Sequence, residues 1–331
     1  MKKIILILNI ILLTGCYDYS KLNELSIISS IGIDYINDNY EITFEIIDND
    51  YNHNITLTAE NIEDAFYKIN NYTSKKPYFY HLKAIIINKE MANKINEIID
   101  YFLRNPKIIH AFYLVISDNV NAKEFLNIDK SNKGNNLEKF LENNPYHYSE
   151  LFEGTIENFY NSHKNALINT FSIKNNQINL SGLAVYKNYE LVTILKDKEY
   201  QLLNLLLNKS NYNLEDNNIT INIYQSKTKI TFSNQINIII NAESQIINSK
   251  DKQGLKNSKT YPTLNKNFSN LLKKEIITLL NNFNELKIDP LNINYQFYQT
   301  YQKELKNYNY NVEINLKVNK KGLIFEAPYD K

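Results

Sequence analysis

The chain has 331 residues with 37 basic and 36 acidic side chains, a formal net charge of +1, and 43% hydrophobic residues. This balance excludes the strongly basic footprint of a nucleic-acid-binding protein, and the hydrophobic content suffices for the cores of two or three domains. The single cysteine, Cys16, excludes disulfide frameworks, CxxC redox motifs and cysteine-rich zinc sites within the chain.

The N-terminus has the pattern of an export signal. Lys2 and Lys3 precede an apolar stretch over residues 4–13, which is broken only by Asn9. The stretch is too short to span a bilayer, which needs about 20 apolar residues, but it suits the hydrophobic segment of a signal peptide. Residues 1–15 are therefore predicted to be removed, which leaves a mature chain with a formal charge of −1.

The end of this segment predicts a lipid attachment site. Leu13-Thr14-Gly15-Cys16 resembles a bacterial lipobox, in which the cysteine sulfur accepts a diacylglyceryl group before the signal peptidase cuts in front of it. Small residues at Thr14 and Gly15 suit the peptidase cleft. Two acyl chains would hold the protein lastingly at a membrane, whereas one chain holds only marginally. The alternative is an ordinary N-terminal helix with a chance cysteine at its end.

Residues 16–128 are predicted to contain an α/β domain. In chain order the patterns give a hairpin over 25–47, a strand at 54–58, a helix at about 61–72, a strand at 82–87, a helix over 91–103 and a strand at 112–116. Asn37-Asp38-Asn39 provides the turn of the hairpin. Alternation of strands and helices favours the α/β class.

Two further domains are predicted. Residues 129–208 begin with a polar segment at 129–144, interpreted as a linker, and continue with helices to 163. A hairpin over 178–195, with its turn at Lys187-Asn188-Tyr189, could pair with the first domain, and a helix follows at about 198–207. Residues 208–218 are polar and mark a second boundary. Residues 209–331 begin with three alternating strands, continue with helices from Pro262 and over 297–308, and close with a strand at 312–318.

No catalytic or metal-binding motif is visible. The five histidines do not have metal-ligand spacing; they are His53, His81, His110, His147 and His163. Gly182 follows Ser181 without the GxSxG pattern of a hydrolase elbow, and a strand residue is the better interpretation. We expect no enzyme activity, no cofactor and no metal.

Three other features have structural and functional interpretations. Arg104 is the only arginine, so it could form a two-bond pairing that lysine cannot reproduce, contact another subunit, or only favour a helix C-terminus. Gly32 is expected to permit a backbone path between Ile31 and Ile33. The aromatic stripe fits a core better than an interface; it comprises Phe297, Tyr298, Tyr301 and Tyr308.

Several segments, in order along nearly the whole chain, are similar to one family. They are LLTGCYDYSKLNELSIISSIGIDY at 12–35, HLKAIIINKEMA at 81–92, DYFLRNP at 100–106, SGLAVYKNYELVTIL at 181–195, YQSKTKI at 224–230 and KIDPLNI at 287–293. On these segments the chain resembles the Ger(x)C lipoproteins, the C subunits of the spore germinant receptors of endospore-forming bacteria. The resemblance marks Asp34, in the Gly-Ile-Asp turn, and Asp289, in the link between two helices, as possible structural or interface residues.

The chain departs from the family pattern at a few positions. Tyr17 stands where the family usually has tryptophan, and Asn105 follows Arg104 where an aspartate is usual. The following family arginine is absent near Ile109 and His110, and asparagines replace the glycines usual after Asp289. An ion pair carried over at Arg104 is therefore not expected to match the family's.

The resemblance implies a fold, a place and partners. The expected fold is α+β or mixed α/β, a three-domain ectodomain with mixed sheets flanked by helices. It would be anchored through acylated Cys16 to the outer face of the spore inner membrane. The partners implied are a polytopic A subunit and a transporter-like B subunit, and the function is receptor assembly and germinant signalling. A solute-binding lipoprotein of an importer and a surface hydrolase are the alternatives.

Overall fold

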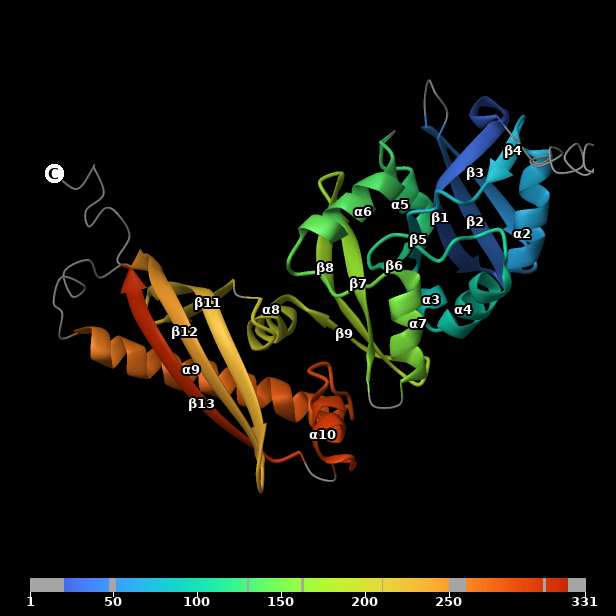
Figure 1. Cartoon of the computed structure of the whole chain (residues 1–331). Helices are drawn as coiled ribbons and strands as arrows, with labels where there is room; N and C mark the ends of the chain where they lie inside the picture. Colours follow the sequence, from blue (N-terminus) through green and yellow to red (C-terminus); the bar gives the residue numbers. More distant parts are fainter. Residues whose placement is uncertain are drawn as a thin grey trace, which may run out of the picture.

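The computed structural model describes residues 21–47, 52–129, 131–161, 164–209, 211–249, 260–305 and 308–320 (Figure 1). The predicted signal peptide and Cys16 lie outside the described residues. Within them, the strands form a nine-stranded and a four-stranded sheet, each flanked by helices. The expected mixed fold, with sheets flanked by helices, is confirmed.

The first sheet has a parallel centre between two antiparallel ends. Its strands in spatial order are β3 (Asn52–Ala59), β2 (Asn39–Ile47), β1 (Leu25–Ile36), β5 (Ala84–Ile87), β6 (Tyr113–Ser117), β7 (Ala166–Lys174), β8 (Gln177–Lys187) and β9 (Glu190–Lys196), with β4 (Lys76–Tyr78) paired to the start of β1. Strands β1, β5, β6 and β7 are mutually parallel. Such strands are buried on both faces, which explains the unbroken Ala-Ile-Ile-Ile run of β5.

Helices cover both faces of this sheet. One face carries α2 (Ile62–Lys68), η2 (Ile69–Asn71), α3 (Lys89–Ala92), α4 (Ile95–Arg104) and α7 (Phe152–Tyr160), and the other carries α5 (Ala122–Leu126) and α6 (Lys133–Asn143). A short turn, η1 (Leu22–Glu24), precedes β1. The helix predicted over 91–103 is divided, because the backbone turns at Asn93 and Lys94 between α3 and α4.

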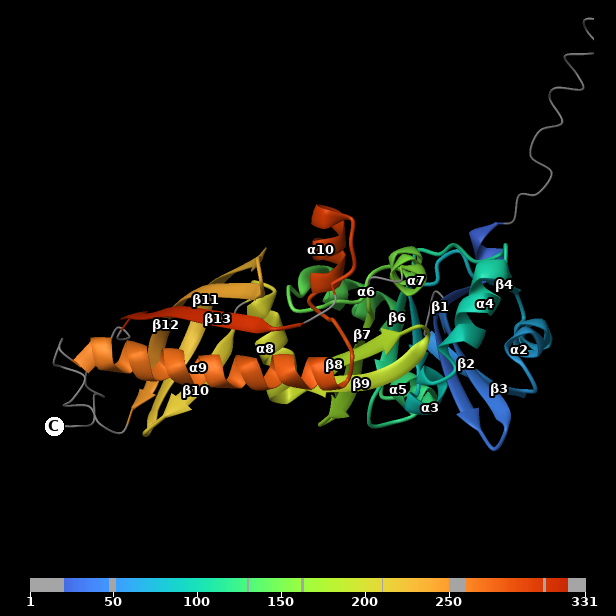
Figure 2. The ribbon, with the colours of Figure 1, turned by 90° about the horizontal axis from the view of Figure 1, so that it is seen from below.

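The second sheet has α9 along one face (Figure 2). After α8 (Asp197–Leu206), its strands are β10 (Tyr212–Asp216), β11 (Ile219–Phe232), β12 (Ile236–Ser249) and β13 (Tyr310–Lys320). The first three are antiparallel, and β13 pairs in parallel with β12 after the chain has passed through α9 (Thr260–Glu285) and α10 (Ile293–Tyr301).

Strand β8 belongs to the first sheet and contributes side chains to two hydrophobic cores. Its residues alternate between two cores, with Ala184 and Tyr186 in the first and Leu183 and Val185 in the second. The predicted hairpin at 178–195 therefore pairs with the first sheet while one of its faces packs against the second.

Asparagines account for the tight turns between several strands. The two central residues of each turn have positive φ: Asn37-Asp38, Asn175-Asn176, Asn188-Tyr189 and Asn217-Asn218. This backbone twist matches that of the flanking strands, and asparagine tolerates it better than most side chains. The turns predicted at 37–39 and 187–189 are confirmed.

Two segments interpreted as polar connections contain ordered elements, so the linker interpretation of 129–144 is wrong, while the domain bounds stay predictions. Residues 133–143 of the expected linker form α6, in which Leu137 and Leu141 are buried. The expected boundary at 208–218 contains β10, whose Tyr212 and Leu214 face the second core. A few buried side chains in a polar stretch were sufficient for each element.

Candidate functional site

Gly32 and Asp34, both in β1, lie together beneath α5. A Cβ at Gly32 would lie 3.1 Å from the Ala122 carbonyl oxygen and from Leu126 Cδ1, so this glycine permits the helix to approach closely. The Asp34 carboxylate accepts hydrogen bonds from Ala122 N at 2.7 Å and Lys123 N at 2.9 Å. Both residues therefore dock α5 onto the sheet.

The Asp34 carboxyl is fully buried, and this determines how it titrates. Burial raises its pKa to about 6, although the two N–H donors at the start of α5 oppose the rise. The neighbouring Glu41 contributes less than burial.

A second set of hydrogen bonds, which no sequence pattern indicates, docks α6 onto the sheet. Glu45 on β2 accepts hydrogen bonds from Lys133 N at 2.6 Å, Gly134 N at 3.0 Å and Ser30 Oγ at 2.6 Å. The Lys133 side chain is also fully buried, and its ammonium group donates to Asp129 and Ser131. A glutamate in an alternating strand resembles a solvent-facing residue, so no sequence signal distinguishes Glu45.

Arg104 is a surface residue. Its side chain is 78% exposed, and among the described residues it forms one ion pair, from Nε to Asp100 Oδ1 at 2.8 Å. The two-bond pairing expected of a lone arginine is not present in the described part of the chain. Arg104 is the last residue of α4, where a positive charge is favourable, and a subunit contact stays a prediction.

Asp289 fixes the start of α10. Its Oδ2 accepts a hydrogen bond from Asn294 N at 2.7 Å, and the N–H groups of Leu291 and Ile293 also donate to this carboxylate. Burial raises the pKa of Asp289 despite these three donors. The Asp289 N–H donates to Asn165 Oδ1, which ties α10 to the first sheet's unit because Asn165 also donates to Tyr186 O.

Helix α10 projects from the body of the molecule (Figure 2). The flanking residues Asn292 and Gln302 both have φ of 53°, a left-handed conformation in which the chain changes direction sharply. Ile293 is the buried residue of this helix. Most of the remaining side chains of α10 therefore face solvent or a groove.

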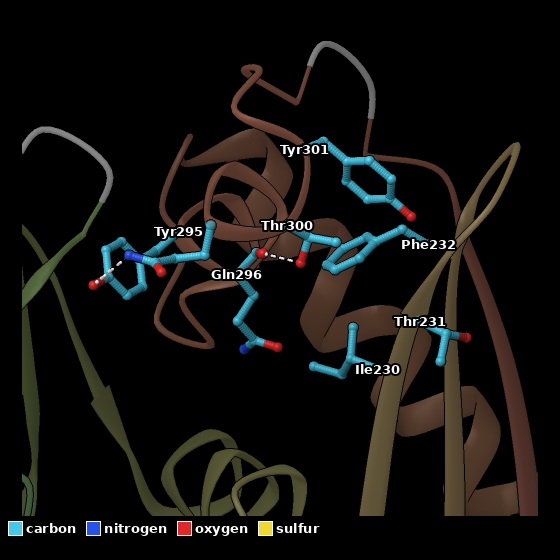
Figure 3. A pocket seen from close by; sticks show the side chains of 8 residues that line it. Ile230, Thr231, Phe232, Tyr295, Gln296, Thr300 and Tyr301 are labelled. Atoms are coloured by element: carbon cyan, nitrogen blue, oxygen red, sulfur yellow. Dashed lines mark hydrogen bonds between the residues drawn. The ribbon is translucent and has the colours of Figure 1, made fainter.

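That groove lies between α10 and the end of β11 and has a volume of about 690 Å³ (Figure 3). It is lined by Ile230, Thr231, Phe232, Tyr295, Gln296, Gln299, Thr300 and Tyr301. The lining contains aromatic rings, amides and hydroxyls but no charged side chain. Pocket residues of this kind suit an uncharged ligand or an uncharged segment of polypeptide.

Tyr301 of the aromatic stripe lines this groove, and the stripe residues of α10 do not belong to the second core, so the interpretation of the stripe as core is wrong for α10. The Phe232 ring lies edge-on to the Phe297 ring with centroids 5.3 Å apart, and Phe297 lies 4.8 Å from Tyr301. Tyr301 is 47% exposed, and Phe297 is half-buried. Tyr308, the last member of the stripe, is half-buried against the second core. Phe232 was missed because it ends a strand 65 residues earlier.

The polar side chains of the groove are partly engaged. Gln299 Nε2 donates to Tyr295 Oη at 3.0 Å, and Gln296 Nε2 donates to Leu291 O at 3.0 Å. Each of these bonds uses the amide nitrogen and not the amide oxygen. Figure 3 shows the Gln296 side chain extending into the space below α10. An amide oxygen beside aromatic rings can accept a hydrogen bond from a bound N–H or O–H group.

Other sites are not found within the described residues. No group of three or more potential metal ligands lies together there, and no helix in that part of the chain is long and apolar enough to cross a membrane. Cys16 and its predicted recognition residues Leu13, Thr14 and Gly15 lie outside the described residues and stay predictions.

Two known relatives are proteins of Bacillus subtilis (strain 168). Spore germination protein KC is 28% identical over 42% of this chain, and the match covers 40% of that protein. The putative spore germination protein YfkR is 20% identical over 85% of this chain and 83% of that protein. The crystal structure of the GerBC protein matches with a TM-score of 0.52 and 16% identity, covering 87% of this chain and 96% of that one. This structural likeness shows a shared fold.

Two family models match in chain order. The model described as the spore germination protein N-terminal domain matches residues 18–173, and the C-terminal model described as spore germination B3/GerAC like matches residues 181–322. Together they cover both sheets and the groove beside α10. The chain therefore belongs to the Ger(x)C family of spore germination proteins.

Proposed function

We propose that this protein is a lipid-anchored, non-enzymatic subunit of a spore nutrient germinant receptor, acting in receptor assembly and germinant signalling. The observation that carries the proposal is the match of both family models, in order, over residues 18–173 and 181–322. The lipobox-like Leu13-Thr14-Gly15-Cys16 supports anchoring at the outer face of the spore inner membrane. The partners proposed are the polytopic A subunit and the transporter-like B subunit.

Deletion of the gene tests the receptor role. Spores without the protein should germinate more slowly, or not at all, with the nutrient that this receptor senses, and normally with a trigger that bypasses receptors. The rate is followed as loss of optical density. If both triggers act at the wild-type rate in a strain without redundant receptors, the proposal is wrong.

The anchor is tested at Cys16. Cys16→Ala removes the sulfur that would carry the diacylglyceryl group, so incorporation of labelled fatty acid should be lost and the protein should leave the membrane fraction. Cys16→Ser, which also lacks the thiol, should behave in the same way. Fatty-acid labelling of either variant at the wild-type level would contradict the anchor.

The groove beside α10 is the proposed contact with another receptor subunit. Its uncharged, aromatic and amide-bearing lining suits an uncharged polypeptide segment, and α10, which forms one wall of the groove, projects from the body of the molecule (Figure 2). Phe232→Ala should reduce co-purification of the other subunits. Phe140→Ala is the matched control, because Phe140 is also partly exposed but lies on α6, away from the groove.

The same groove is where a solute would bind if the protein instead served an importer. Free amino acids or sugars would then raise the melting temperature of the mature chain, and Phe232→Ala would remove the effect. The fold offers little support for this alternative, because the second sheet is mainly antiparallel and does not form a second α/β lobe.

A further inference from the structure

The start of β1 and the short strand β4 lie side by side at one end of the first sheet (Figure 1). Leu25 pairs with Lys76, and Ile27 pairs with Tyr78, in parallel register. The segment η2, which ends just before Tyr72, packs beside β4. Residues from three parts of the chain therefore share the surface from which the N-terminal segment departs.

This surface, which we call the tyrosine surface, comprises Tyr72, Tyr78, Tyr80, Lys21 and Lys76. The Tyr72 and Tyr80 side chains are 62% and 47% exposed, and both lysines are exposed. The Tyr78 ring stacks on Tyr80 with centroids 5.2 Å apart. Glu24, on η1, is an exposed acidic residue close to it in the chain.

The chain length from Cys16 restricts what can lie against this surface. Lys21 follows Cys16 by five residues, which span at most about 18 Å when fully extended. If Cys16 carries acyl chains, the bilayer that holds them must therefore come within about this distance of Lys21. A protein partner would have to fit into the same narrow space.

The composition of the surface suits the lipid headgroup region. Tyrosine is enriched there because its ring is apolar and its hydroxyl is polar, and lysines are attracted to anionic lipids. Stacked rings such as Tyr78 and Tyr80 also have fewer conformations to lose on binding. These properties favour a membrane over a dry protein interface, from which lysine is depleted.

We propose that the tyrosine surface binds the anionic membrane to which Cys16 is attached, and that this second contact sets the orientation of the protein. The inference rests on the proposed lipid anchor. A single flexible tether leaves the body free to rotate, whereas a tether and an adjacent binding surface fix it. The first sheet's β4 end then faces the bilayer, and the second sheet projects away from it (Figure 2).

The test measures membrane binding without the anchor. The mature chain from residue 16, carrying Cys16→Ser, is sedimented with vesicles of equal parts phosphatidylcholine and phosphatidylglycerol, and with vesicles of phosphatidylcholine alone. Binding should require the anionic lipid and fall with added salt. Lys76→Ala should weaken partitioning about fivefold, the factor that corresponds to about 1 kcal/mol for one lysine. Tyr80→Ser should weaken it as well.

Matched controls separate this surface from general charge and hydrophobicity. Tyr67→Ser removes a tyrosine that is 75% exposed on α2, and Lys139→Ala removes an exposed lysine on α6; neither should change partitioning. Circular dichroism of each variant verifies its fold. Equal partitioning of all variants, or no binding to anionic vesicles, would overturn the inference. So would loss of subunit co-purification in Tyr80→Ser without loss of vesicle binding, because the surface would then bind a protein.

Failure of the anchor is detected separately. Fatty-acid labelling of the full chain reports on Cys16, whereas the vesicle experiment uses a chain that has no thiol. An unlabelled full chain would contradict the proposed function, and an unbound Cys16→Ser chain would contradict only the tyrosine surface.

Discussion

At the scale of single residues, Asp34 illustrates a balance between two opposing effects. Removal of the carboxylate from water disfavours its charge, while the two N–H groups of α5 favour it. Burial is the larger effect, because the pKa is raised to about 6. The charged form is therefore less favourable in the folded protein than in the unfolded chain.

This balance predicts a pH dependence of stability. Because the folded-state pKa lies above the unfolded value of 3.8, the folded protein binds the proton more tightly between these values. Lowering the pH from 7 to 5 should therefore add about 1 kcal/mol to the free energy of unfolding through this group. Asp34→Asn should lack that increment in urea titrations. An identical pH dependence in both proteins would contradict the role of Asp34.

For Arg104 we predict that substitution has almost no effect on stability. Its side chain is 78% exposed and pairs with Asp100 one turn earlier on α4. Such surface pairs contribute little, and lysine preserves the charge at the helix end. Arg104→Lys should leave the melting temperature unchanged within about 1 °C. A drop of several degrees in thermal unfolding would mean that the guanidinium has a structural partner beyond Asp100.

At the scale of elements, two helical glycines are expected to respond oppositely to alanine. A Cβ at Gly134 on α6 would overlap the backbone and hydroxyl of Ser29 on β1, which cannot move aside. A Cβ at Gly154 on α7 would meet only the side chain of Glu150, with Oε2 nearest and Cβ at 3.1 Å, and no backbone atom is among these contacts. The first glycine permits close packing of helix on sheet, and the second only lowers helix propensity.

Gly134→Ala should therefore lower the free energy of unfolding by about 1–3 kcal/mol, the usual cost of overpacking. Gly154→Ala should raise it by up to about 1 kcal/mol, the helix-propensity difference between glycine and alanine. Both values follow from urea denaturation of the mature chain. If the two variants changed stability in the same direction, the docking of α6 onto β1 would be in doubt.

At the scale of the whole molecule, β8 makes the two sheets interdependent. Leu183 and Val185 belong to the second core, and their neighbours Ala184 and Tyr186 belong to the first. Unfolding either unit would expose an apolar face of the other. We therefore expect a single cooperative transition in differential scanning calorimetry, with equal calorimetric and van't Hoff enthalpies. Two resolved transitions would show that the sheets unfold independently.

Much of this fold follows from local patterns in the sequence. The alternating strands near residues 40–46 and 178–195 are period-2 patterns, and their asparagine turns occur where expected. Helix α6 was missed because only Leu137 and Leu141 provide its apolar face, while the docking of its first turn depends on the distant Glu45. No local pattern reports a contact between residues almost ninety positions apart.

The candidate site was less predictable than the fold. The stripe on α10 has the helical spacing of a core face, and the sequence cannot show that only the end of β11, at Phe232, packs against its rings Phe297 and Tyr301. Asp289 was marked only by a family resemblance, and its three backbone partners depend on a turn that ends with the left-handed Asn292. The tyrosine surface combines η2, β4 and the start of β1, which meet only in the folded chain.

The pairing of β13 with β12 determines when the second sheet is completed during synthesis of the chain. Its partner β12 begins 74 residues earlier, since Ile236 pairs with Tyr310, and β13 contributes Val312, Leu316 and Val318 to the second core. A chain that emerges from its N-terminus first can assemble the whole nine-stranded sheet while the four-stranded sheet still lacks an edge. Closing so long a connection is entropically costly and slow. Among the described strands, the last one to be synthesised is thus the one that completes the second core, and that core lacks an edge strand until residues 310–320 have been made.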